Sequence, residues 1–380
     1  MWSCCRTSTY VAILALVLGV VFPTRPGYAQ RPDTRRTVVI GDIHGDLEGL
    51  TAILRQAGIT DASNRWAAGN TIVVQTGDMT DRGARVRGVL DLLIALERQA
   101  STAGGRLVVL LGNHEVMNLA GDFRDVSAEA YASFADAQSE DRRRNAYEAY
   151  VRVCESRAEL FAGTLPAAFQ AMSRDEWMSA HPAGTIEYRE AFGPSGRYGR
   201  WLRQKAAVLQ LGDIAFMHAG INPATAPPRL DDINELVAND IRRLDGYRRR
   251  MTDRKLILPW FGIGDVLLAA QLDRQNFGDL TQIDKWSLFD PEGPMWFRGF
   301  ASWSKQEGPT QIKALLQRYK LAHFVVGHTV TETRRITPQF ANAVFLIDTG
   351  MIFAGGTASA LEIQGGRFTA ISANGRTLFE

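Results

Sequence analysis

Six polar side chains that can bind metal ions follow apolar runs, where the strands of a sheet would end. They are Asp42, His44, Asp78, Asn113, His218 and His328. Carboxylate, amide and imidazole groups are hard or borderline donors, and because no thiolate is among them they favour Mn, Fe or Zn. Two such ions can share one water, lower its pKa and neutralise phosphoryl oxygens together. The pattern therefore predicts a two-metal centre that hydrolyses phosphoesters.

The placement of the histidines supports this interpretation. Four of the six follow apolar runs typical of buried strands, and these four are His44, His114, His218 and His328. His181 precedes a proline in a polar segment, and His323 lies within a predicted strand. We therefore expect structural roles for the last two.

The spacing suggests how the ligands divide between two ions. Asp42 and His44 are two residues apart at one strand end, so both can face one ion. Asp78 is the natural bridging ligand, because one short carboxylate can give an oxygen to each of two ions about 3.5 to 4 Å apart. The second ion is completed by three further residues, Asn113, His218 and His328.

The elements that must position these residues alternate between strand and helix from residue 36 onward. Apolar runs at 37–40, 71–74 and 107–111 predict buried strands. Apolar residues at helical spacing predict helices over 47–58 and 84–99. Ligands that follow such strands lie at the carboxyl edge of a sheet, the usual place of a site in an α/β fold.

The strand pattern stops after the third strand. Residues 116–205 are expected to form a helical insert, a cap over the metals, because 127–162 is rich in Ala, Glu and Arg. Two hairpins that turn at glycines are predicted later, over 208–217 and 361–371. The other predicted elements are helices near 231–245 and 309–320 and strands at 323–326 and 344–347.

Five motifs in a fixed order resemble those of a known family. They are Gly41 to His44, Gly77 to Gly83, Gly112 to Glu115, His218 to Gly220 and Gly327 to Thr329. The set resembles the calcineurin-like metallophosphoesterases, and within them the phosphoprotein phosphatase branch. The last motif lacks the second histidine found in many other branches, and no tyrosine follows Asp78 where purple acid phosphatases supply one to iron. The resemblance implies an α/β fold, a four-layer αββα sandwich over residues 36–380 with a helical cap insert.

A narrower resemblance is to the bacterial Shewanella-like protein phosphatases. It is carried by three further segments, Glu115 to Asp122, Gly293 to Arg298 and Ile347 to Gly350. It implies a phosphorylated protein or peptide as the substrate and favours phosphotyrosine.

The family resemblance also implies roles for four residues that do not bind metal. His114 would be the acid for the leaving group, Asp81 would orient His114, and Arg82 and Arg298 would clamp the phosphate. The chemistry of phosphoryl transfer supports the two arginine roles, because a transferring phosphoryl group is stabilised by bidentate cations. Arg298 has an alternative interpretation, in which residues 296–298 form an ordinary amphipathic strand.

The expected reaction is hydrolysis of a phosphomonoester. Asp42, His44 and Asp78 with water would hold the first ion, and a metal-bridging hydroxide would attack phosphorus in line. Two other functions stay open. One is a hydrolase of dinucleoside polyphosphates or nucleotides, since related folds host both activities. The other is a non-catalytic extracytoplasmic binding protein, which the loss of a ligand would favour, and no ligand is missing.

The N-terminal segment differs from the rest of the chain. Arg6 precedes an uncharged apolar run over residues 10–22, and small residues follow at Gly27 and Ala29. A run of this length is short for a bilayer span and fits a secretory signal cleaved after Ala29. Residues 1–29 are therefore expected to be a signal peptide that directs the protein to the periplasm or the exterior. A retained N-terminal anchor is the alternative.

The composition is that of a globular protein, with 46% apolar residues among 380. Removal of residues 1–29 takes away two arginines and no acid, so the net charge falls from +2 to 0. This balance gives no general attraction to nucleic acid. Only Cys154 would remain, which excludes an internal disulfide. We expect no nucleic-acid partner and no stable membrane association after signal cleavage.

Overall fold

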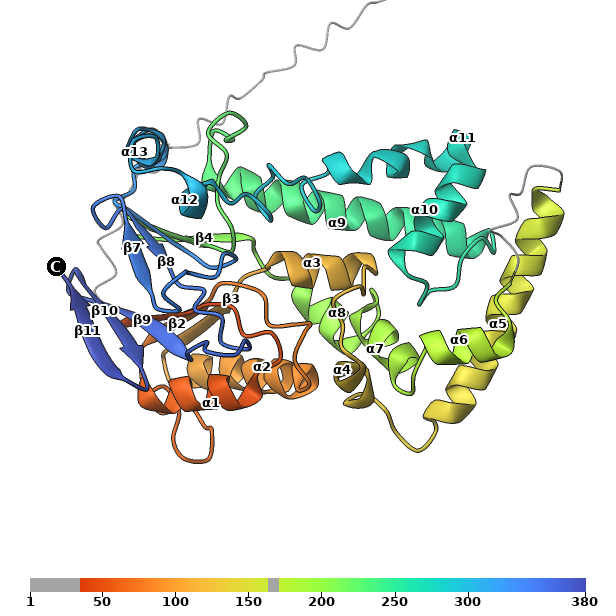
Figure 1. Ribbon diagram of the computed structural model, residues 1–380, viewed down its shortest axis with the longest axis horizontal. Helices are drawn as coiled ribbons and strands as arrows, with labels where there is room; N and C mark the ends of the chain where they lie inside the picture. The colour runs from red at the N-terminus through yellow and green to blue at the C-terminus, as the bar shows by residue number, and fades with distance from the viewer. Residues whose placement is uncertain (1–34, 163–170) are drawn as a thin grey trace, which may run out of the picture. The chain divides into compact units, whose positions relative to one another are not determined.

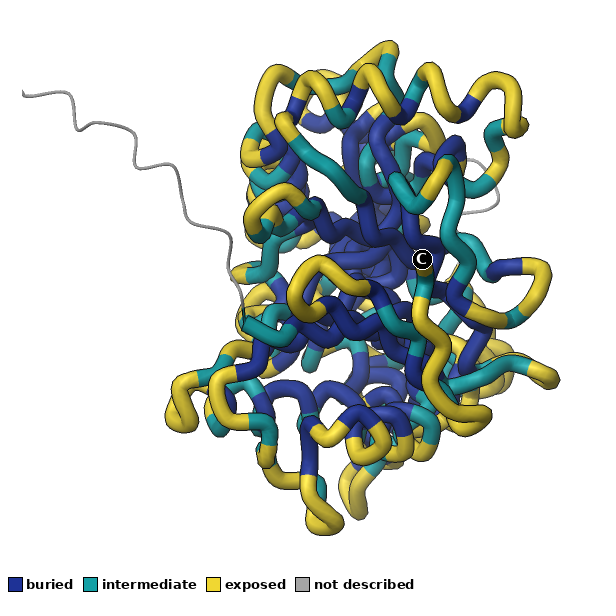
Figure 2. The backbone as a smooth tube through the Cα atoms, turned by 90° about the vertical axis from the view of Figure 1, so that its left-hand side faces the viewer, coloured by how far each residue is buried: buried dark blue, intermediate teal, exposed yellow. Residues whose placement is uncertain are grey.

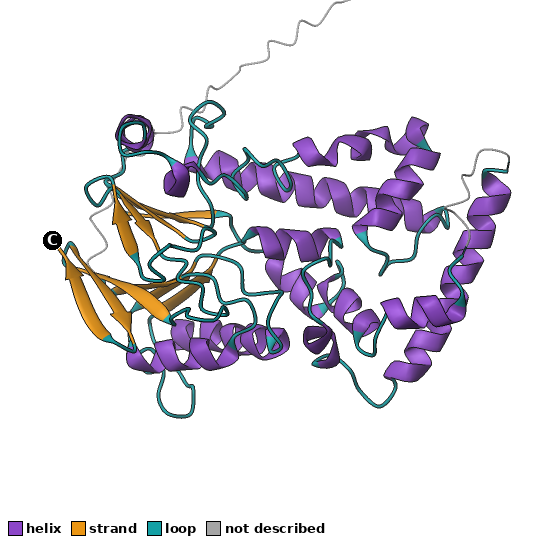
Figure 3. Cartoon of the chain, in the orientation of Figure 1, coloured by secondary structure: helices purple, strands orange, loops and turns teal. Residues whose placement is uncertain are grey.

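The computed structural model describes residues 35–162 and 171–380, and these form a mixed α/β protein with two β-sheets (Figures 1 and 3). The predicted signal peptide lies outside the described residues. The first sheet has the order β11-β10-β9-β1-β2-β3. Its strands are β1 (Thr37–Ile40), β2 (Ile72–Gln75), β3 (Arg106–Val109), β9 (Ser359–Gln364), β10 (Arg367–Ser372) and β11 (Gly375–Phe379).

The second sheet has the order β4-β5-β6-β8-β7. Its strands are β4 (Val208–Leu211), β5 (Ile214–Met217), β6 (His323–Val326), β7 (Thr337–Gln339) and β8 (Val344–Leu346). Both predicted hairpins are present, as β4 with β5 and β9 with β10. Within each sheet a parallel set, β1-β2-β3 or β5-β6-β8, brings its carboxyl ends to one edge.

Apolar side chains on alternate faces of the strands hold the layers together. A cluster that includes Val39, Phe216 and Phe345 draws its members from both sheets and fills the space between them. Val38 and Ile40, which point the other way from β1, belong to the cluster that includes the helices. Figure 1 shows α1 (Leu47–Gln56) and α2 (Val86–Thr102) outside the first sheet, and α9 (Leu230–Asp253) and α13 (Gly308–Tyr319) outside the second. The predicted four-layer sandwich is confirmed.

The segment predicted to be a helical insert is helical where it is described. Its helices are α3 (Asn113–Ala120), α4 (Ala128–Ala132), α5 (Ser139–Leu160), α6 (Arg174–Ala180), α7 (Thr185–Phe192) and α8 (Arg197–Leu202). The tube in Figure 2 shows buried backbone gathered inside exposed outer turns. Cys154 in α5 is buried and free. The limits of the helical insert, residues 116–205, stay a prediction.

Several helices in the part of the chain between β5 and β6 were not predicted. They are α10 (Ile263–Leu272), α11 (Arg274–Phe277), the 3₁₀ helix η2 (Gly278–Lys285) and α12 (Gly299–Ser302). Helix α9 also continues past the predicted end near residue 245, because Tyr247 and Met251 extend its buried face. Across residues 35–162 and 171–380, the helices lack the combination of length and hydropathy that a bilayer span requires.

Candidate active site

The five motif loops meet where the parallel strands of both sheets end. All six predicted ligands are buried there, and they are Asp42, His44, Asp78, Asn113, His218 and His328. Asn113 and His114 form the first turn of α3. The N-terminus of α3 therefore presents adjacent side chains in two directions.

The loops that carry the ligands adopt a backbone conformation that is rare for residues other than glycine. His44 (φ 47°), Asp78 (φ 57°) and His328 (φ 67°) all lie in the left-handed region. Such residues cost on the order of 1 to 3 kcal/mol each and persist where the surroundings hold them. Here the amides of Ile43 and His44 both donate to the Asp78 carbonyl oxygen, at 2.8 and 2.9 Å.

Glu115 fixes the Asp78 loop from the other side. Its buried carboxylate accepts hydrogen bonds from the amides of Gly112 (2.9 Å), Asp78 (2.7 Å), Met79 (2.8 Å) and Thr80 (3.1 Å). Burial and the nearby Asp78 charge raise the pKa of Glu115, and the backbone amides oppose that shift. The sequence contained Glu115 as part of a motif but did not indicate this supporting role.

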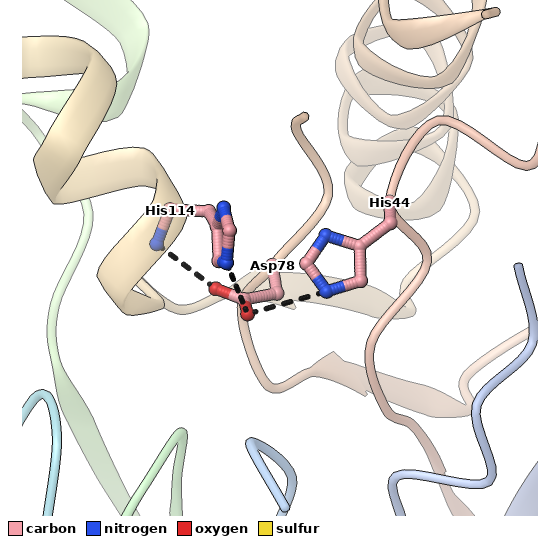
Figure 4. Close-up of side chains that lie close together, drawn as sticks. All are labelled: His44, Asp78 and His114. Carbon is pink, nitrogen blue, oxygen red and sulfur yellow. Dashed lines mark hydrogen bonds and ion pairs between the residues drawn. The ribbon is translucent and has the colours of Figure 1, made fainter. Parts of the chain in front are cut away.

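Asp78 lies at the centre of two groups of possible ligands. One group is His44, Asp78 and His114, and the other is Asp78, His218 and His328. Within each group the ligand atoms lie within 4.8 Å of one another. Figure 4 shows His44 and His114 on either side of the Asp78 carboxylate.

The two oxygens of Asp78 divide between these groups. Oδ2 lies 3.5 Å from His44 Nε2, and Oδ1 lies 3.3 Å from His218 Nε2. A bridging carboxylate requires this division. Burial alone would raise the pKa of Asp78, but the neighbouring imidazoles of His218 and His114 hold it well below its usual value.

The histidines expose the ring nitrogens that a metal would use. Nδ1 lies within reach of a backbone carbonyl oxygen, at 2.9 Å in His44 and 3.2 Å in His218. Because a carbonyl oxygen only accepts, Nδ1 donates and Nε2 keeps its lone pair. His328 is reversed, since its Nε2 donates to a carbonyl oxygen at 3.0 Å. Burial lowers the pKa of His44 to about 3 and of His328 to about 2, so both rings stay neutral.

Acceptor atoms of two of these histidines and of Asn113 lie close together. His218 Nε2 lies 2.8 Å from Asn113 Oδ1 and 3.0 Å from His328 Nδ1. With these tautomers no hydrogen lies between the atoms, so a cation would relieve their repulsion. Metal-binding histidines commonly donate their other ring N–H to a carbonyl oxygen in this way. The residues therefore fit a bound metal.

Buried carboxylates reinforce this conclusion. Asp42 belongs to neither three-residue group, and both of its oxygens accept from the His328 amide, at 3.1 and 3.2 Å. Burial raises the pKa of Asp42 well above its usual value, and the charges of Asp348 and Asp78 add to this effect. Crowded carboxylates are costly to bury unless cations or protons compensate them. The sequence indicated Asp348 only as part of the segment Ile347 to Gly350, without a role of its own.

His114 forms a pair with Asp81. Its Nδ1 lies 2.7 Å from Asp81 Oδ2, and Asn118 Nδ2 donates to the other Asp81 oxygen at 2.8 Å. Burial would lower the pKa of His114, but the charge of Asp78 and the hydrogen bond to Asp81 raise it to about 9. A raised pKa favours the protonated imidazole, the form that an acid for a leaving group must adopt.

The two predicted phosphate-binding arginines flank the centre. Arg82 reaches Nε2 of His44 at 2.7 Å and Nε2 of His114 at 3.0 Å. Arg298 donates to the backbone oxygen of His328 and to Thr329 Oγ1, both at 3.0 Å. Arg298 precedes α12 and lies outside every strand of the described chain, so the alternative of an amphipathic strand is wrong.

The two remaining histidines lie elsewhere. His323 Nδ1 donates to the Asn342 carbonyl oxygen at 2.8 Å, and His181 Nδ1 donates to that of Trp177 at 2.9 Å. Neither belongs to the ligand groups found among the described residues.

Residues 35–332 match the family model of calcineurin-like phosphoesterases, which is most of the chain. The protein belongs to this family, whose members use a dinuclear metal centre, and it is a metal-dependent phosphoester hydrolase. This confirms the predicted enzyme class.

The chain is also similar to two named protein phosphatases. Shewanella-like protein phosphatase 2 of Arabidopsis thaliana is 34% identical over 216 residues, 56% of this chain and 53% of that protein. Shewanella-like protein phosphatase 1 of Plasmodium berghei is 22% identical over 320 residues, 83% of this chain and 67% of that protein. The chain thus spans about half of the Arabidopsis relative. The chain is therefore similar to proteins of the predicted branch.

A solved structure supports the fold. The cold-active protein-tyrosine phosphatase of a psychrophilic Shewanella species superposes with a TM-score of 0.60 at 24% identity. The match covers 91% of this chain and 80% of that one.

Proposed function

We propose that the protein is a phosphoprotein phosphatase that prefers phosphotyrosine. The observation that carries this proposal is the Asp78 carboxylate shared by two ligand groups, with Arg82 and the His114–Asp81 pair beside it. Metal ions, Mn, Fe or Zn, would be held by Asp42, His44, Asp78, Asn113, His218 and His328. When bound, they activate a water for in-line attack and neutralise phosphoryl oxygens.

The chain's own residues perform the other parts of the reaction. The Arg82 guanidinium can give two parallel hydrogen bonds to the phosphoryl oxygens, and Arg298 adds a second cation. His114 donates its Nε2 proton to the departing oxygen, and Asp81 holds the ring through Nδ1. His114 and Asp81 are buried, which strengthens the interaction between them, whereas Arg82 and Arg298 are exposed to solvent.

The relatives guide the choice of substrate. Two of them are named protein phosphatases, and a protein of the same fold is a protein-tyrosine phosphatase. These likenesses favour phosphotyrosine in a protein over a nucleotide.

A panel of substrates tests the proposal. The metal-loaded protein is assayed for phosphate release from matched phosphotyrosine and phosphoserine peptides, and for nucleotides released from a dinucleoside polyphosphate. We expect the phosphotyrosine peptide to be hydrolysed with the highest kcat/KM. Release of nucleotides without phosphate release from either peptide would contradict the proposal.

We also propose that the enzyme acts in the periplasm or outside the cell. The uncharged run at residues 10–22, followed by Gly27 and Ala29, supports export. Its substrates would then be phosphorylated proteins or peptides outside the cytoplasm.

A further inference from the structure

A tyrosine from α7 reaches the pair formed by His114 and Asp81. Tyr188 is fully buried, and its hydroxyl donates a hydrogen bond to Asn118 Oδ1 at 2.9 Å. The same hydroxyl oxygen lies 3.5 Å from Asp81 Oδ1. Helices α3 and α7 pack against each other and bring these residues together (Figure 1). The helical segment thus contacts the catalytic pair directly.

Asn118 carries the connection from Tyr188 to Asp81. Its Nδ2 donates to Asp81 Oδ1 at 2.8 Å and to the His114 backbone oxygen at 2.9 Å, which uses both amide hydrogens. With the amide reversed, its oxygen would face the Asp81 carboxylate, and two acceptors would repel each other. This orientation leaves the Asn118 oxygen free to accept the hydrogen bond from the Tyr188 hydroxyl, which holds the amide in place.

Aromatic packing holds the Tyr188 ring independently of its hydroxyl. Its centroid lies 4.6 Å from that of Phe192, 4.8 Å from Phe134 and 5.2 Å from Tyr131. Removal of the hydroxyl alone should leave the ring in place. Burial, and then the charge of Asp81, raise the pKa of Tyr188 well above its usual value, so the hydroxyl stays a donor.

We propose that Tyr188 is a positioning residue, which acts through Asn118 on the hydrogen bond between Asp81 and His114. The inference rests on the proposed function, because it requires His114 as the proton donor. Asp81 accepts from Asn118 on one oxygen and from His114 Nδ1 on the other, at 2.8 and 2.7 Å. A fixed carboxylate fixes the imidazole, whose Nε2 then points at the leaving oxygen. Helix α7 of the predicted insert thereby contributes to catalysis.

The variant Tyr188→Phe has a matched control in Tyr198→Phe. Tyr198 packs on Phe134 and Phe192 in the same aromatic cluster, but its hydroxyl donates to Asp91 at 2.8 Å. Each variant removes one buried hydroxyl and keeps its ring. Only the first removes a hydroxyl that contacts the catalytic pair.

Rates on two small substrates separate positioning from general weakening. Phenyl phosphate has a poor leaving group that needs an acid, whereas 2,4-dinitrophenyl phosphate does not. For Tyr188→Phe we expect kcat on phenyl phosphate to fall about 10-fold, part of the effect of a general acid. The KM and the rate on the dinitrophenyl ester should change by less than about 2-fold, as should all values for Tyr198→Phe. Equal losses on both esters, or equal losses in both variants, would overturn the proposal.

A second measurement does not depend on turnover. In protein with ¹⁵N-labelled histidine, the Nδ1–H signal of His114 is identified by its absence from His114→Ala. We expect this signal to shift in Tyr188→Phe and to stay in place in Tyr198→Phe. An unchanged signal in both variants would refute the inference. Failure on phosphotyrosine peptides alone would count against the proposed substrate class instead, because neither measurement uses a peptide.

Discussion

Asp78 gives one oxygen to each ligand group, so its loss should disturb both metal positions. His44 contacts only the Oδ2 side. We predict that Asp78→Asn abolishes turnover and lowers metal affinity by more than the roughly 10- to 100-fold that loss of a supporting residue costs. His44→Ala should keep more metal than Asp78→Asn. Elemental analysis of both variants, after dialysis against the same buffer, measures the difference.

Two retained metals with a normal rate in Asp78→Asn would contradict the bridging role. Equal metal loss in the two variants would show that the positions are occupied only together.

His114 can be separated from the metal ligands by its leaving-group dependence. Its Nε2 lies 3.8 Å from Asp78 Oδ2, close enough for a ligand role, while its Nδ1 is held by Asp81. As a general acid, it contributes about 10²- to 10⁴-fold when the leaving group is poor. We predict that His114→Ala keeps both metals and loses little rate on an aryl phosphate with an acidic phenol. It should lose far more on phosphotyrosine or an alkyl phosphate.

A series of leaving groups measured for the wild type and His114→Ala decides this question. An unchanged dependence on leaving-group pKa, together with metal loss, would assign His114 to the metal centre or to support of the loop.

At the scale of elements, glycines allow the motif loops to approach one another. A Cβ atom on Gly112 would lie 2.2 Å from Asp78 Oδ1 and 2.5 Å from the Asp78 amide nitrogen. A Cβ atom on Gly327 would similarly lie 2.2 Å from Asp42 Oδ1. These glycines precede ligands because a larger residue would displace the carboxylate.

We predict that Gly112→Ala lowers metal affinity by about 10- to 100-fold, the usual effect of disturbing the residues around a ligand. Gly264→Ala is the control, because Gly264 is exposed in α10 and a Cβ atom there meets nothing within 4 Å. That control should bind metal normally and be no less stable, since alanine favours helices. Metal titration by calorimetry compares the two. Normal affinity in Gly112→Ala would show that the loops can separate without harm.

The sequence predicts elements with strong local signals and misses those that depend on distant partners. The strand before Gly41 and the hairpin at Gly365 follow from apolar runs and turn residues, and both were predicted correctly. The helices from Ile263 to Lys285 were missed, because their buried residues follow no long amphipathic stripe.

The same limit applies to the site. Its ligands could be found because each follows an apolar run, and Tyr188 could not. Periodicity indicates which face of α7 is buried but not that it packs against Asp81, which lies 107 residues earlier. The sequence identified Asn118 and Glu115 only as members of a motif and indicated no role for either.

For the whole molecule, export is the first expectation to test. Residues 1–29 combine a basic start, an uncharged apolar run and a small-residue cleavage site. We predict that protein recovered from the periplasm or medium begins at Gln30, which an intact-mass measurement shows directly. Material that still includes Met1 would favour the retained anchor.

The dependence of turnover on two metals tests the central claim most directly. Metal-depleted protein is titrated in turn with Mn²⁺, Fe²⁺ and Zn²⁺ while phosphate release from a phosphotyrosine peptide is followed. We predict negligible release without metal, and for at least one ion a rise that saturates at two ions per chain. Full activity in the metal-depleted protein, or saturation at a single ion, would contradict a two-metal phosphatase.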